Sequence, residues 1–312
     1  MADIILHHYP ASPFSEKVRL MLGYKGLAWK SVIVPSIAPK PDVVALTGGY
    51  RKTPFLQIGK DVYCDTALIA QVLDDLQPTP ALRHATQPDV AAVVAQWADS
   101  SLFWAAMGYN FQPKGAAGFF DGAPPEVAAA FAQDRAAMSA GMTRLRPGDA
   151  TTAYRNYLQR LEGMLANAAY LLGAQPCIAD FSAYHGLWFT RTCTPALAGV
   201  FTAFPAVSAW MERMAAIDHG RMEKFSAQQA IALCAGAASP AELPTAVPVD
   251  DHGIPLGALV SVSAESFGQE PTVGELVAAT ADRFTLRRTD ERAGLVHVHF
   301  PRIGFVLRKA ER

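Results

Sequence analysis

The chain has 312 residues, of which 51 % are hydrophobic and 18 % are charged, so it is a folded protein long enough for two or three domains. Its formal net charge of −1 argues against nucleic acid or an anionic membrane as a partner. No stretch reaches the roughly 20 consecutive apolar residues of a membrane span, and the N-terminus lacks a signal-peptide pattern, so we expect a cytoplasmic protein.

Residues 1–80 alternate strand and helix patterns, in the order βαβ followed by ββα. This order predicts a small α/β domain. The predicted elements are strand Ile4–His8, helix Pro13–Tyr24, strand Trp29–Val34, a helical turn at Val43–Leu46, a hairpin of Pro54–Ile58 with Asp61–Cys64, and a helix that begins at Asp65.

The turn between the first strand and the first helix carries a serine at the predicted helix start. Ser12 lies where an N-cap residue belongs, and Pro13 occupies the first helical position, where its missing N–H costs nothing. The first turn of a helix presents unpaired N–H groups and the positive end of the helix dipole, which favour a bound anion. The Ser12 hydroxyl can therefore cap the helix or donate a hydrogen bond to an anion.

Pro54 begins the predicted hairpin. Proline cannot donate a hydrogen bond to a sheet, so it belongs at the first residue of a strand or on an edge. A cis bond after Thr53 would leave the Thr53 backbone N–H and C=O facing outward, as a docking strip for a peptide-like ligand. An ordinary trans proline in a turn is the alternative, and the sequence leaves both open.

After a linker at 78–88 rich in Pro, Thr and Ala, the hydrophobic period becomes helical. Residues 89–235 predict an all-α domain of about five to seven helices, in which Ile178–Thr190 is apolar nearly all round and should be central. The predicted helices are Val90–Tyr109, Glu126–Met142, Thr151–Leu172, Ile178–Thr190, Phe204–Ile217 and Met222–Ala235.

A second linker at 236–253 leads to residues 254–312, a small α+β module where the period returns to two. A few strands in about sixty residues are marginal alone, so we expect this module to pack against the helical domain. Its predicted elements are strands Ala258–Ser263, Phe284–Arg288, Leu295–His299 and Phe305–Leu307, with a short helix at Thr272–Thr280.

Five motifs, in this order along the chain, resemble those of the cytosolic glutathione transferases. They are Ser12–Arg19 at the first turn, Arg51–Pro54 before the hairpin, Asp65–Ala70 at the third helix, the helix Tyr157–Leu172, and Ile178–Tyr184. The resemblance is to serine-type members and covers residues 3 to about 228. It implies a thioredoxin-like domain packed on a helical bundle, in a homodimer, while the β-rich module at 254–312 resembles an extension found in certain bacterial and fungal members.

The resemblance also implies roles for individual residues toward glutathione, which would be a co-substrate, with no cofactor and no metal. Ser12 matches the residue beside the glutathione sulfur, and Tyr9 is the runner-up because other classes use a tyrosine near this turn. Thr53 matches the residue whose backbone pairs with the cysteinyl part, with Pro54 as the cis-proline.

The two ends of glutathione have candidates as well. Asp65 and Thr66 match the pair that holds the γ-glutamyl end, although Asp65 replaces the commoner glutamate and shortens the reach slightly. Lys52 and Lys40 are weaker candidates for the glycine carboxylate. In the helical domain Cys177 replaces the usual serine or threonine cap while Asp180 is retained, and we interpret both as structural.

A hydrophobic second substrate would need an apolar pocket. We expect Phe103, Met107 and Phe111, which lie at helical spacing, to form it with Phe14 beside the sulfur. The spacing alone is more typical of an ordinary hydrophobic core than of a substrate pocket. Phe119 and Phe120 are candidates for a lid.

Three further sets of residues, namely the cysteines, two histidines and four arginines, are more typical of structural roles than of functional sites. The four cysteines lack C-x-x-C spacing, which predicts free buried thiols. His297 and His299 alternate onto one strand face, but two ligands without a third do not indicate a metal site. A basic group in the last module is more typical of a solvated face than of a binding site, and consists of Arg287, Arg288, Arg302 and Arg308.

The sequence therefore predicts a glutathione transferase that activates the glutathione thiol with Ser12 for attack on a hydrophobic electrophile. A serine cannot form a mixed disulfide, which argues against thiol-transferase chemistry. Two alternatives remain open. One is a non-catalytic binding protein with the same fold, and the other is a specialised glutathione-dependent enzyme that cleaves ethers or removes halogens.

Overall fold

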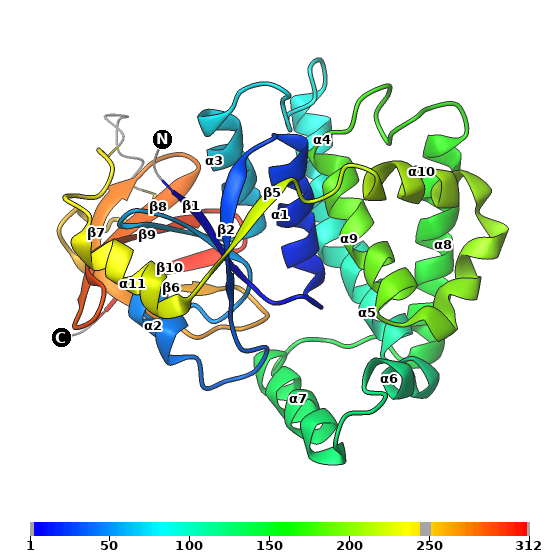
Figure 1. Cartoon of the computed structure of the whole chain (residues 1–312), viewed down its shortest axis with the longest axis horizontal. Helices are drawn as coiled ribbons and strands as arrows, with labels where there is room; N and C mark the ends of the chain where they lie inside the picture. The colour runs from blue at the N-terminus through cyan, green and yellow to red at the C-terminus, as the bar shows by residue number, and fades with distance from the viewer. Residues whose placement is uncertain (1–2, 244–250, 311–312) are drawn as a thin grey trace.

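The computed structural model describes residues 3–243 and 251–310. A mixed sheet lies on one side of the molecule and a bundle of helices on the other, with α1 between them (Figure 1). Within the described residues the sheet has ten strands in the order β10-β6-β7-β8-β9-β4-β3-β1-β2-β5.

The first domain has the predicted thioredoxin-like order. β1 pairs parallel with β2 and antiparallel with β3, and β3 pairs antiparallel with β4. The elements are β1 (Ile4–His8), α1 (Pro13–Tyr24), β2 (Ala28–Ile33), α2 (Pro41–Thr47), β3 (Phe55–Ile58), β4 (Asp61–Cys64) and α3 (Thr66–Leu76).

The second domain is the predicted helical bundle. Its central helix is α9, which is buried over most of its length and packs against α1, α4 and α5, so the prediction of a central helix is confirmed. The elements are α4 (Pro88–Trp97), one π-helical segment η1 (Ala98–Leu102), α5 (Phe103–Asn110), α6 (Pro113–Phe119), α7 (Pro125–Met138), α8 (Pro147–Leu165), α9 (Ile178–Thr192), the 3₁₀ segment η2 (Pro195–Ala203) and α10 (Pro205–Ala215).

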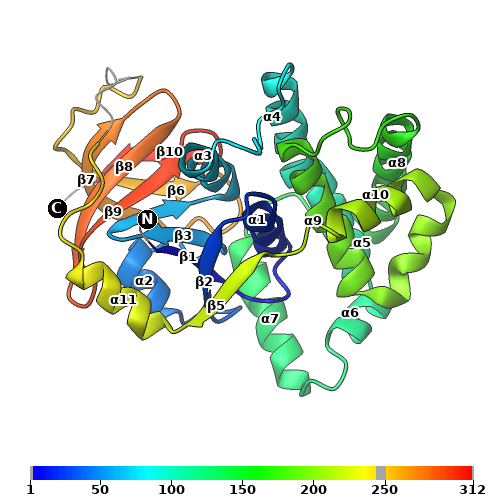
Figure 2. The same ribbon diagram turned by 45° about the horizontal axis from the view of Figure 1, so that its top comes forward.

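The chain then returns to the sheet, which the sequence did not predict. The expected single helix Met222–Ala235 is instead a strand followed by a helix, β5 (Arg221–Phe225) and α11 (Ala227–Gly236). β5 pairs parallel with the outer edge of β2, and this pairing overrides the helical propensity of its residues. Figure 2 shows β5 crossing back from the helical domain to lie beside β2.

The C-terminal region is a set of strands, β6 (Leu259–Ala264), β7 (Thr272–Ala279), β8 (Arg283–Asp290), β9 (Gly294–Pro301) and β10 (Phe305–Lys309). The predicted helix Thr272–Thr280 is wrong. β7 pairs with β6 on one side and β8 on the other, and burial along it largely alternates from residue to residue, as a strand requires.

The predicted packing of these strands on the helical domain is also wrong. β9 pairs parallel with β4, so the C-terminal strands extend the thioredoxin-like sheet. Val62 and Phe55 belong to the same buried cluster as Val298 and Phe300. The region therefore shares its core with the first domain, and one segment of it, the loop 265–271, reaches the helical domain.

Within the described ranges, no helix has both the length and the apolar character needed to cross a membrane.

The shared core predicts that the first domain and the C-terminal strands unfold together. Phe300 is fully buried in that core, so Phe300→Ala should lower the free energy of unfolding by about 3–5 kcal/mol. Val273→Ala removes an apolar side chain that is 45 % exposed on β7, and should cost less than about 0.5 kcal/mol. Urea denaturation followed by circular dichroism measures both; separate transitions for the two regions would contradict a shared core.

Candidate functional site

Three of the predicted motifs meet at one end of the thioredoxin-like sheet. β3 runs antiparallel to β1 and starts at Phe55 opposite His7, and the same Phe55 pairs with Cys64 at the end of β4. The turn after β1, the residues before β3 and the residues after β4 therefore lie side by side. These segments carry Ser12, Thr53–Pro54 and Asp65–Thr66 respectively.

Ser12 is the N-cap of α1, with Pro13 at the first helical position, as predicted. Its Oγ accepts a hydrogen bond from the backbone N–H of Ser15 at 3.2 Å, and the residue is only 2 % exposed. No acceptor for the Ser12 hydroxyl proton lies within hydrogen-bonding distance among the described residues. The proton is thus available for a ligand atom held at the helix N-terminus.

The Thr53–Pro54 bond is cis. Among the described residues, neither the N–H nor the C=O of Thr53 has a hydrogen-bond partner. An unpaired backbone edge of this kind can bind an extended peptide-like ligand by main-chain hydrogen bonds.

The start of α3 is shaped by Asp65. This residue has φ of 78°, which is unfavourable for a residue with a side chain, and its carboxylate accepts the N–H of Ala67 at 2.9 Å as the N-cap of α3. Strain of this kind persists where surrounding structure enforces it and is concentrated at binding sites. The next residue, Thr66, accepts a hydrogen bond at its Oγ1 from Lys17 at 3.0 Å.

Lys17 belongs to a polar cluster between the two domains. Its buried Nζ lies 2.6 Å from Oδ2 of Asp99 in the π-helical segment η1, and Asp99 also accepts from His185 Nε2 at 3.0 Å and from Ser182 Oγ at 3.3 Å. Burial would raise the pKa of Asp99, but Lys17 and the His185 hydrogen bond outweigh it and hold that pKa below its usual value. Burial lowers the pKa of His185, which is neutral at physiological pH.

This interdomain cluster was not predicted from the sequence, and consists of Lys17, Thr66, Asp99, Ser182 and His185. One signal for it was present. Lys17 lies three residues after Phe14 and four before Met21, on the side of α1 that the apolar residues occupy. A cation on such a face indicates a buried anionic partner, but nothing in the sequence pointed to Asp99 as that partner.

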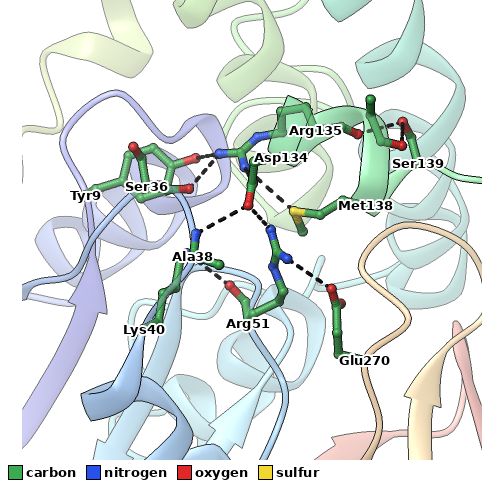
Figure 3. Close-up of polar contacts among 11 residues, drawn as sticks. Tyr9, Ser36, Ala38, Lys40, Arg51, Asp134, Arg135, Met138, Ser139 and Glu270 are labelled. Carbon is green, nitrogen blue, oxygen red and sulfur yellow. Dashed lines mark hydrogen bonds and ion pairs between the residues drawn. The ribbon is translucent and has the colours of Figure 1, made fainter. Parts of the chain in front are cut away.

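A second polar network joins α7 of the helical domain to the first domain (Figure 3). Nη2 of Arg135 donates to the Tyr9 hydroxyl at 3.3 Å and to the Ser36 carbonyl at 2.9 Å. Asp134 pairs with Arg51, whose other amino group lies 3.0 Å from Oε1 of Glu270. The hydroxyl of Tyr9, the runner-up for the sulfur, is therefore held toward α7.

The two lysines predicted at the glycine end differ in their surroundings. Lys40 donates to the Arg51 carbonyl at 3.1 Å, and burial, reinforced by Arg135 and Arg51, lowers its pKa to about 8. The Lys52 ammonium lies 5.4 Å from the ring centre of Tyr50 and 5.0 Å from that of Phe305, and has no carboxylate partner among the described residues.

The predicted pocket residues divide into two groups. The rings of Phe14 and Phe103 lie 4.7 Å apart, so α1 and α5 meet where expected. Met107 follows one turn after Phe103, and both side chains are buried to the same extent. Phe111 lies a turn further along, in a separate aromatic cluster with Phe119, Phe131 and Phe189.

The other candidate groups have structural contacts. His299 Nε2 lies 2.9 Å from Asp61 Oδ1, while His297 Nδ1 is 3.8 Å from the same oxygen. No group of three or more His, Cys, Asp or Glu suited to a metal ion occurs in the described part of the chain. Asp180 accepts from the Cys177 N–H at 3.0 Å, from the Leu171 N–H and from Trp210 Nε1.

Comparison with known proteins identifies the family of this chain. Residues 6–81 match the family model "Glutathione S-transferase, N-terminal domain", and residues 147–218 match "Glutathione S-transferase, C-terminal domain". A GST-like protein from Pseudomonas syringae is 41 % identical, with a TM-score of 0.83 over 99 % of this chain and 100 % of that one. The chain belongs to the glutathione S-transferase superfamily.

More distant relatives have different names. FtsZ-localized protein A of Caulobacter vibrioides is 25 % identical over 183 residues, which are 57 % of this chain and 73 % of that protein. The beta-etherase LigF of Sphingobium sp. strain SYK-6 shares the fold, with 20 % identity and a TM-score of 0.50 over 68 % of this chain and 95 % of that one.

The Lys17–Asp99 pair predicts a large effect of removing the cation. Lys17→Met leaves the Asp99 carboxylate without its cation at the domain interface, and should lower the free energy of unfolding by about 3–5 kcal/mol. Lys30→Met breaks the exposed pair with Asp3 and should cost at most about 1 kcal/mol. Chemical denaturation compares them, and equal losses would show that burial of the pair is unimportant.

Buried neutral histidines predict acid sensitivity. Burial lowers the pKa of His7 to about 4, so His7 stays neutral in the folded chain while the unfolded chain binds a proton below pH 6.5. Stability should therefore fall as pH drops from 6.5 toward 4, by up to about 1.4 kcal/mol per pH unit for each such histidine. His7→Gln should reduce this slope in urea titrations at several pH values; an unchanged slope would remove His7 from the explanation.

Proposed function

We propose that this protein is a glutathione transferase that binds glutathione at Ser12, Thr53 and Asp65–Thr66. The convergence of these three positions at one end of the sheet supports the proposal. The unpaired Thr53 backbone takes the cysteinyl part of the tripeptide. The N–H groups at the start of α3 face the γ-glutamyl carboxylate, and the Asp65 carboxylate suits its ammonium.

The thiol is activated at the start of α1. An ordinary cysteine thiol has a pKa of about 8.5, and a helix N-terminus with a donated hydroxyl proton favours the thiolate. The thiol proton leaves to solvent, and the Ser12 hydroxyl donates to the sulfur. The sulfur lone pair then forms a bond to the electrophilic carbon of an apolar acceptor, and the leaving group on that carbon departs with the electron pair of its bond. Phe14, Phe103 and Met107 form the acceptor side of this site.

The glycine carboxylate goes to Lys40 in this proposal, and Lys52 has a weaker claim. Lys40 has a single carbonyl as its hydrogen-bond acceptor in the described chain, whereas the rings of Tyr50 and Phe305 flank the Lys52 ammonium. The protein acts as a homodimer in the cytoplasm, as is usual for the superfamily it resembles.

A non-catalytic role is the second candidate, because one relative is named for where it localises. Retention on immobilised glutathione, combined with a screen of model electrophiles, separates the two. Retention without turnover would favour binding alone.

Ser12→Ala tests the activation step. Loss of one hydrogen-bond donor to the sulfur should raise the pKa of bound glutathione's thiol and lower kcat/KM by about a hundredfold. Ultraviolet absorbance of the thiolate and a pH–rate profile measure these effects.

Two variants serve as controls. Ser15→Ala removes an equally buried hydroxyl one turn along the same helix and should leave both quantities nearly unchanged. Tyr9→Phe tests the runner-up. If Tyr9→Phe, and not Ser12→Ala, raised the thiol pKa, the sulfur would belong to Tyr9.

A further inference from the structure

The loop 265–271, between β6 and β7, links the C-terminal strands to both other domains. The ring of Phe267 lies 5.2 Å from the ring of Trp104 on α5. The Gly268 N–H donates to the Met138 carbonyl, at the end of α7, at 2.8 Å. Glu270 pairs with Arg51, two residues before Thr53. We call this segment the cross-domain loop.

The centre of the cross-domain loop passes close to Met138 of the helical domain and to Lys52 of the first domain. Gly268 has φ of +66°, and a Cβ added there would lie 2.8 Å from Cε of Met138 and 3.1 Å from Cγ of Lys52. The backbone is thus pressed between the helical domain and the residue that precedes Thr53. The same close approach brings the adjacent Phe267 against Trp104 of the helical domain.

A continuous row of aromatic rings runs from the sulfur position to the cross-domain loop. Phe14 contacts Phe103 at 4.7 Å, Phe103 contacts Trp104 at 5.0 Å, and Trp104 contacts Phe267 at 5.2 Å between ring centres. Neighbouring rings are tilted or edge-on, so they present both faces and edges. Phe14, Trp104 and Phe267 are each only partly buried and can still contact a ligand.

We propose that Phe267 of the cross-domain loop forms the outer wall of the acceptor site and selects flat aromatic electrophiles. Aromatic rings recognise one another by offset and edge-to-face contacts, at an energy beyond that of simple burial. An acceptor whose reactive carbon lies at the glutathione sulfur, near Phe14, would extend along this row toward Phe267. The C-terminal region, outside both matched family models, then contributes directly to specificity.

The role proposed for Phe267 rests on the proposed function, because it assumes that glutathione binds at the tripeptide site. The experiment therefore measures binding of the tripeptide and the contribution of the aromatic row separately. Binding of S-methylglutathione and S-benzylglutathione to the full-length protein is measured by calorimetry. The methyl conjugate reports the tripeptide site, and the affinity ratio of the two conjugates reports the aromatic row. We expect the benzyl conjugate to bind the wild type about tenfold more tightly than the methyl conjugate.

Phe267→Ala should reduce that ratio to about two, and leave the affinity for the methyl conjugate within about a factor of two. Phe225→Ala removes another partly buried ring, on the far edge strand β5, and should leave the ratio unchanged. Phe267→Leu keeps apolar packing in the loop and gives an intermediate ratio, which separates loss of the ring from misfolding.

An unchanged ratio in both Phe267 variants, with the methyl conjugate still bound, would overturn the role of the loop and leave the proposed function standing. If neither conjugate binds the wild type, the proposed function fails. The same variants are then titrated with 1-naphthol, which lacks the tripeptide. Weaker 1-naphthol binding in the Phe267 variants alone would support the aromatic wall, and equal binding in all variants would overturn it.

Discussion

The parallel pairing of β9 with β4 is the constraint on which the rest of the structure depends. Without it, β4 would be an open edge of the thioredoxin-like sheet, with unpaired N–H and C=O groups. β9 covers that edge, and the strands attached to it share the buried cluster of Val62 and Phe55. The last part of the chain is thereby fixed to the same sheet whose end carries the proposed glutathione strip, formed by Ser12, Thr53 and Asp65–Thr66.

A second constraint acts between the sheet domain and the bundle. The Lys17–Asp99 pair, with Thr66 and His185, places charged groups where an apolar interface would also pack. Buried ion pairs contribute little net stability compared with apolar contacts. Our hypothesis is that this pair instead fixes the relative orientation of the two domains, because a misaligned interface would leave its charges unpaired. Here the orientation matters, since Thr66 adjoins the γ-glutamyl end of the proposed strip while Asp99 belongs to the helical domain.

The sequence predicted local features well and distant pairings poorly. Ser12 as a helix cap follows from a Ser-Pro pair at a strand–helix turn, and that prediction is confirmed. The helix predicted at Thr272–Thr280 failed because a run with Gly274, Glu275 and small residues has no clear period, and pairing with two strands decided its conformation. The helix predicted over Met222–Ala235 was wrong at its start for the same reason. Residues Arg221–Phe225 form strand β5, because they pair with β2, which lies almost two hundred residues earlier in the chain.

In the proposed site too, the residues of local motifs were predicted from the sequence, and the residues brought together by distant contacts were not. Its peptide-binding half consists of helix starts and a proline bend, which short motifs reveal. Its outer half depends on the contact of Phe267 with Trp104 and of Glu270 with Arg51, and each joins residues more than 150 positions apart. No local pattern marks such residues, and Phe267 lies in a loop of ordinary composition.

The two ends of the proposed glutathione strip differ in how many side chains determine ligand binding. At the sulfur end the contacts come from a helix start, a backbone edge and one hydroxyl, so few side chains matter. At the glycine end Arg51 is shared by Asp134 of α7 and Glu270 of the cross-domain loop. Because Lys40, proposed for the glycine carboxylate, donates to the Arg51 carbonyl, the charge balance of that end depends on all three parts of the chain at once. Substitutions in the cross-domain loop are therefore expected to alter recognition at the proposed glycine end without touching Ser12, which is proposed to activate the thiol.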